Sequence, residues 1–68
     1  MSDVEIYKDY EIEYETRESA GIFSVLANAR EFPRQTGQCP HYFEGMSRDV
    51  EEARRIARAK ATRWIDGS

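Results

Sequence analysis

The chain has 68 residues, a net charge of −3 at neutral pH and a single cysteine. This length predicts one domain, 1–68, which buries only about 60% of its unfolded surface and would gain stability by associating with another protein. One cysteine excludes an internal disulfide, and no apolar run approaches the ~18 residues of a membrane-spanning helix, so we expect a cytoplasmic protein that does not enter a membrane.

The first predicted element is a strand over residues 4–17, where apolar and acidic side chains alternate. Such period-two alternation is typical of a strand with one buried face. The even positions put Tyr10, Ile12 and Tyr14 on the core face. The odd positions put a row of carboxylates on the opposite face, namely Glu11, Glu13 and Glu15, preceded by Tyr7.

A hairpin is expected next, because Glu18-Ser-Ala-Gly21 contains a glycine that can take a positive φ. The second strand is placed at residues 22–30, where two registers compete. We favour the register that turns Phe23 and Val25 toward the core, and the alternative turns the even-numbered residues inward. In either register, two large apolar side chains remain on a sheet face that one helix cannot cover.

Two prolines and a glycine between Phe32 and Pro40 predict an exposed loop. A third strand is expected at residues 41–46, with Phe43 facing the core. Its outward residues would then be Tyr42, Glu44 and Met46.

The last third of the chain predicts one amphipathic helix from Asp49 to Gly67. Asp49 followed by Glu52 forms a capping-box pattern, and Gly67 supplies the stop. One stripe of the helix is apolar and mostly alanine, so its backbone can approach a flat sheet closely. The stripe consists of Val50, Ala53, Ala57, Ala61 and Trp64, with Ile56 and Ile65 on either side. Together the elements predict an α+β fold, a three-stranded antiparallel β-meander with one C-terminal helix packed on one face (β-β-β-α).

No catalytic, cofactor-binding or metal-binding motif stands out in the sequence. Cys39 and His41 lie two residues apart, but a zinc site needs four ligands and a Cys–His nucleophile needs a third group to orient the base. The chain has no other cysteine or histidine. We therefore expect a protein that is not an enzyme and uses no cofactor.

The outward side chains of the sheet are the best candidates for a protein interface. The row of glutamates indicates either a solvated face or an electrostatic docking surface for a basic partner. Tyrosine and methionine are enriched where proteins meet, and a monomer rarely leaves an apolar patch exposed. The candidate partner-binding residues are Tyr7, Glu11, Glu13, Glu15, Tyr42 and Met46. We expect a protein partner or self-association, including a homodimer.

A nucleic-acid-binding module is the alternative function. It would use four arginines on the exposed arc of the helix, namely Arg54, Arg55, Arg58 and Arg63. Phosphate binding requires a net positive patch, and the interspersed Glu51 and Glu52 and the acidic pI of about 5.1 weaken this interpretation.

The segment Phe43-Glu-Gly-Met-Ser-Arg-Asp-Val-Glu-Glu-Ala53, with the tyrosine-rich hairpin before it, resembles the HicB-like antitoxin fold. In that family a three-stranded meander leads into a helix that starts with Gly-x-(Ser/Thr)-x-Glu-Glu-Ala. Asp49-Val-Glu-Glu-Ala53 matches the helix entry, although Gly45 lies two residues further from it than the family's usual spacing. Gly37-Gln-Cys39 is similar to the family's Gly-Cys segment.

The resemblance implies binding to a small, basic, RNA-cleaving toxin, without the DNA-binding domain that family members commonly carry. A small bacterial protein that merely shares the β-β-β-α topology is the alternative.

Overall fold

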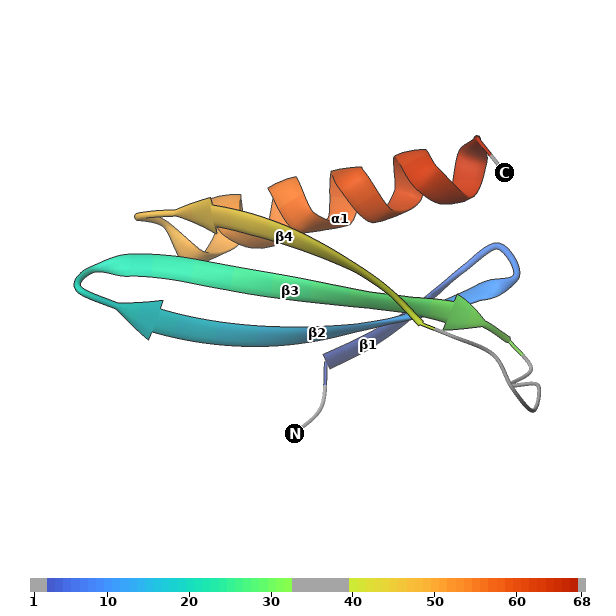
Figure 1. Ribbon diagram of the computed structural model, residues 1–68, viewed down its shortest axis with the longest axis horizontal. Coiled ribbons are helices and arrows are strands. Elements are labelled where there is room, and N and C mark those ends of the chain that lie inside the picture. The colour runs from blue at the N-terminus through green and yellow to red at the C-terminus, as the bar shows by residue number, and fades with distance from the viewer. Residues whose placement is uncertain (1–2, 33–39, 68) are drawn as a thin grey trace.

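The computed structural model describes residues 3–32 and 40–67, which form one antiparallel sheet with a helix across one face (Figure 1). The strands follow one another across the sheet in chain order. The elements are β1 (Asp3–Tyr7), β2 (Tyr10–Ser19), β3 (Ile22–Glu31), β4 (His41–Ser47) and α1 (Val50–Asp66). The α+β class and the C-terminal helix are confirmed, whereas the prediction of three strands is wrong because the sheet has four.

The segment expected to be one strand is a hairpin, in which the chain reverses at Lys8 and Asp9 between β1 and β2. Tyr7 pairs with Tyr10 across this two-residue turn, and Lys8 takes a positive φ of 54°. The turn lacks the glycine that usually marks such hairpins, so its composition gives little signal. Residues that pair across two strands share a face, so odd-numbered Tyr7 lies on the same face as even-numbered Tyr10. The alternation therefore changes phase at the turn.

The second hairpin agrees with the expectation from the sequence. Ala20 and Gly21 both have positive φ, 52° and 79°, as a type I′ turn requires. β2 and β3 then pair over all ten residues of each strand. This register turns Phe23 and Val25 toward the helix, which confirms the favoured register, and Phe43 of β4 packs on the same side. The predicted loop before β4 falls mainly on residues 33–39, outside the described residues.

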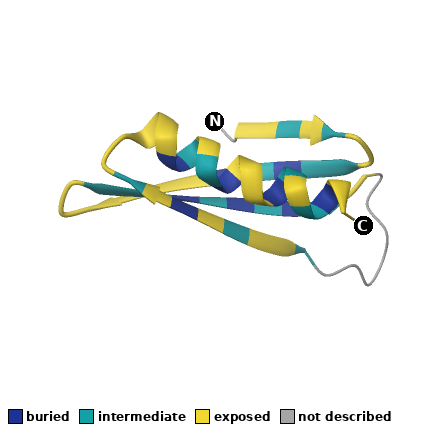
Figure 2. Cartoon of the chain, turned by 90° about the horizontal axis from the view of Figure 1, so that it is seen from above, coloured by how far each residue is buried: buried dark blue, intermediate teal, exposed yellow. Residues whose placement is uncertain are grey.

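The helix α1 begins and ends at the predicted caps. The Asp49 side chain accepts a hydrogen bond from the Glu51 backbone N–H at 3.0 Å, and the Gly67 N–H donates to the Arg63 carbonyl at 3.1 Å. The exposed side of the helix faces away from the sheet, and its buried stripe faces the strands (Figure 2). That stripe consists of Ala53, Ala57, Ala61 and Ile65, whereas Val50 in the first turn is exposed.

The helix backbone lies close against the sheet at Gly45 of β4. A Cβ at this position would lie 2.1 Å from the Ala53 carbonyl oxygen and 2.6 Å from the Ala57 backbone nitrogen. Only a glycine fits opposite the alanine stripe at such a distance. Beside this contact, Ile12 and Val25 are fully buried and fill the space under the helix. The small residues therefore set the spacing of the two layers, and the large ones fill it.

Candidate functional site

The sheet face that points away from α1, here called the open face, is not covered by any described element (Figure 1). The strand registers assign to it alternate residues of all four strands. The open face comprises Val4, Ile6, Glu11, Glu13, Glu15, Arg17, Ser19, Ile22, Ser24, Leu26, Asn28, Arg30, Tyr42, Glu44 and Met46. Of the candidate partner-binding residues, this set includes Glu11, Glu13, Glu15, Tyr42 and Met46.

Apolar side chains lie along both edges of the open face. On the β1 edge, Val4 and Ile6 are 42% and 54% exposed. On the β4 edge, Tyr42 and Met46 are each 57% exposed. Burial of large apolar side chains such as these normally contributes about 1.5–3 kcal/mol each, so their exposure leaves a substantial driving force for association unused. The β1 contribution was not expected, because the sequence placed Val4 and Ile6 on the core face.

The row of glutamates lies where it was predicted, along β2 in the middle of the open face. Two of the three are paired within the sheet. Arg30 donates to Glu13 through Nη2 at 3.3 Å, and Arg17 donates to Glu15 through Nη2 at 2.9 Å. The Glu11 carboxylate has no partner among the described residues. The face as a whole carries four glutamates and two arginines, so it is acidic but not uniformly so.

Arg30 and Asn28 form a polar centre of the open face that the sequence analysis did not single out. Both lie on β3 and are half-buried. The Arg30 Nε and the Asn28 Oδ1 are buried atoms without a hydrogen-bond partner among the described residues. Buried polar atoms are normally bonded, because an unmade bond costs about 1–3 kcal/mol. The period-two pattern of β3 could have placed both residues on this face beside Leu26.

The open face has a hollow at the end where the turn joins β2 to β3. The apolar side chains of Ile22 and Met46 line this hollow together with Arg17 and Ser24. The Ser24 hydroxyl donates a hydrogen bond of 2.8 Å to the Glu44 carboxylate. The hollow and the exposed Met46 therefore belong to one surface.

Tyr7 was expected on the open face, and this placement is wrong. The phase change at the Lys8–Asp9 turn puts Tyr7 on the helix side, where it packs against the core. Its hydroxyl donates to the Asp66 carboxylate at 3.0 Å, and Lys8 forms an ion pair with the same carboxylate. Tyr7 therefore joins β1 to the end of α1 and does not take part in the open face.

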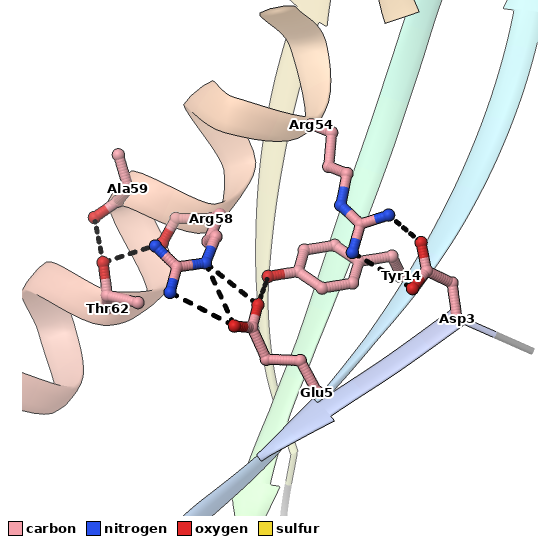
Figure 3. Close-up of polar contacts among 7 residues, drawn as sticks. All are labelled: Asp3, Glu5, Tyr14, Arg54, Arg58, Ala59 and Thr62. Atoms are coloured by element: carbon pink, nitrogen blue, oxygen red, sulfur yellow. Dashed lines mark hydrogen bonds and ion pairs between the residues drawn. The ribbon is translucent and has the colours of Figure 1, made fainter. Parts of the chain in front are cut away.

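Two of the four helix arginines are paired with carboxylates of β1 (Figure 3). Arg54 forms a bidentate ion pair with Asp3, and its guanidinium lies 4.4 Å from the centre of the Tyr14 ring. Arg58 donates to both oxygens of Glu5, through Nε at 3.0 and 3.2 Å and through Nη2 at 3.1 Å. These ion pairs form because the change of phase at the Lys8–Asp9 turn directs Asp3 and Glu5 toward the helix.

Glu5 is the centre of this charged contact. It also accepts a hydrogen bond of 2.6 Å from the Tyr14 hydroxyl (Figure 3). The hydrogen bond from Arg58 lowers the pKa of Glu5, against the opposing effect of burial, and the bond from Tyr14 lowers it further. Burial and the hydrogen bond to Glu5 raise the pKa of Tyr14. Both shifts favour the observed state, in which the charged Glu5 carboxylate accepts a hydrogen bond from the neutral phenol of Tyr14.

The other two arginines, Arg55 and Arg63, are exposed, and their side chains bond to no residue that the structure describes. Arg55 lies beside Glu51 and Glu52 at the start of the helix. The four arginines thus do not form one continuous positive surface: two are neutralised by β1 and a third adjoins glutamates. This arrangement does not favour the nucleic-acid alternative.

Of Cys39 and His41, the structure describes only His41, because Cys39 lies outside the described residues. His41 packs against Trp64, with ring centres 4.2 Å apart, and Trp64 also contacts Tyr10 and Phe43. This aromatic cluster covers one end of the core. Within residues 3–32 and 40–67, no group of three His, Cys, Asp or Glu residues is placed to hold a metal ion. The helix in this part of the chain is not long and apolar enough to cross a membrane.

Comparisons of the chain with protein-family models, with curated proteins and with solved structures gave no significant match.

Proposed function

We propose that the chain is a protein-interaction module that is not an enzyme and that binds through its open face. The observation that carries this proposal is the uncovered sheet face itself. Its two edges carry four exposed apolar side chains, Val4, Ile6, Tyr42 and Met46. A single helix covers the other face, so the hydrophobic core lies entirely on that side.

The composition of the open face also supports an interface. Apolar and aromatic groups at the edges would supply the affinity, and the charged residues between them would select the partner and fix its orientation. The partly unsatisfied Arg30 and Asn28 would gain hydrogen bonds from a bound surface. The resemblance to HicB-like antitoxins points to the same class of function and stays a prediction.

Site-specific photo-crosslinking in the producing cells tests this proposal. A photoreactive phenylalanine analogue at position 46, on the open face, is expected to form a defined covalent adduct with a protein. The matched control carries the same analogue at position 63, where the exposed Arg63 lies on α1, and is expected to form none. Equal labelling at both positions, or no adduct at position 46, would contradict the proposal.

A further inference from the structure

We infer that the open face binds the open face of a second copy of this chain, in a two-fold dimer whose axis runs parallel to the strands, between β2 and β3. This inference rests on the proposed function, because it names the partner of the same surface. Its basis is the order in which the strand registers place side chains across the sheet.

The cross-strand rows show why the face is complementary to itself. One row reads Val4, Glu13, Asn28, Tyr42 from β1 to β4, and the next reads Ile6, Glu11, Arg30 from β1 to β3. A two-fold axis along the strands preserves position along each strand and reverses the order of strands. It therefore lays β2 over the partner's β3 and β1 over the partner's β4.

This overlay brings favourable groups together at the centre of the interface. Glu11, whose carboxylate has no partner within the described chain, lies over Arg30 of the second copy. The Arg30 Nε, buried and without an acceptor, then receives a carboxylate, and arginine prefers to bind carboxylates with two N–H groups. The contact occurs twice, since Arg30 of the first copy also meets Glu11 of the second.

The remaining parts of the overlay avoid contacts between like charges directly opposite each other. Glu13 lies over Asn28 and Glu15 lies over Leu26 of the second copy. At the edges, the apolar Val4 lies over Tyr42. A two-fold axis across the strands at Glu13 would instead set glutamates of β2 against one another, whereas the axis along the strands pairs Glu11 with Arg30 twice. Aligned sheets packed about 10 Å apart leave room for these side chains to meet.

The size of the open face predicts how stable the dimer is. Four strands of 5, 10, 10 and 7 residues cover about 500 Å² of sheet at the usual strand spacing and rise. Stable interfaces of standard size bury about 800 Å² on each partner. The dimer is therefore expected to be weak and to dissociate on dilution, as small specific interfaces do.

Complementary charge reversal tests the arrangement. Sedimentation equilibrium of the wild-type chain is expected to show a reversible monomer–dimer equilibrium. The single variants Glu11→Arg and Arg30→Glu should each weaken self-association by at least about tenfold, because like charges then meet twice across the interface. Mixing the two variants should restore association, since one chain is then positive and the other negative at both contacts. An intrachain pair cannot explain such a rescue, because each variant has like charges at both positions.

Two controls keep the test decisive. Thermal unfolding of each variant shows that it is folded. Glu52→Arg makes the same change of charge at an exposed residue of α1, outside the open face, so it should leave the dissociation constant near the wild-type value. A monomeric wild-type chain at all concentrations, or a mixture that fails to associate, overturns the inference. In that case an adduct of another mass at position 46 would leave the proposed function standing, whereas no adduct would remove both.

Discussion

Replacing Gly45 with alanine tests the contact that sets the distance between helix and sheet. The new Cβ would lie 2.1 Å from the Ala53 carbonyl oxygen, 1.3 Å inside the 3.4 Å at which ordinary contact begins. It would also lie 2.6 Å from the Ala57 nitrogen. Both are backbone atoms, so no side-chain rotation relieves the clash and α1 must move away from β4. Overpacking of this kind costs about 1–3 kcal/mol or more, and alanine's better strand preference recovers only about 0.5–1 kcal/mol.

We therefore expect Gly45→Ala to lower the free energy of unfolding by about 2 kcal/mol or more, a large part of the roughly 3–10 kcal/mol expected for a chain of this size. Urea unfolding followed by Trp64 fluorescence measures this change. Gly67→Ala is the matched control, because its Cβ would lie 3.4 Å from the Arg63 carbonyl and should change stability by less than about 0.5 kcal/mol. Gly21→Ala meets no atom within 4 Å but has a φ of 79°, so it should cost about 1 kcal/mol. Equal unfolding midpoints for the variants at 45 and 67 would refute the close approach.

The charged contact between β1 and α1 leads to two more expectations. Tyr14→Phe removes the hydrogen bond to Glu5 and should lower the free energy of unfolding by about 1 kcal/mol. Tyr42→Phe is the control and should change it little, because the Tyr42 hydroxyl bonds to no described residue. Equal losses for the two variants in urea unfolding would contradict this. Because Arg58 lowers the pKa of Glu5, the stability from this carboxylate is present above its unfolded pKa and is lost as the pH falls through the lower folded value. Amide exchange in β1 should therefore speed up relative to β3 in acid, and Glu5→Gln should reduce that difference.

Much of the architecture could be predicted from local patterns. The helix follows from the spacing of its alanines and from the caps at Asp49 and Gly67. The second hairpin follows from Gly21. The register of β3 was the harder choice, because both of its faces carry large apolar groups, and it was decided correctly for Phe23 and Val25. Where a pattern lies within one element, the sequence is enough.

The close approach at Gly45 could not be deduced in the same way. A glycine inside a strand signals a bulge or a nearby backbone, and the alanine stripe signals a helix that can come close. Neither pattern shows that Gly45 contacts the alanine stripe, because this contact depends on where the helix crosses β4. The same holds for Arg30, whose contact with Glu13 depends on pairing between β2 and β3.

One unrecognised turn accounts for the main errors about the candidate site. With no glycine at Lys8 and Asp9, the alternation from residue 4 to residue 17 matches the pattern of a single strand with an unbroken phase. The reversal turns the odd-numbered side chains of β1 toward the helix, so Tyr7 leaves the open face while Val4 and Ile6 join it. It also brings Asp3 and Glu5 to Arg54 and Arg58. The turn thus makes the open face more apolar and the helix less basic, and both changes favour protein binding over nucleic-acid binding.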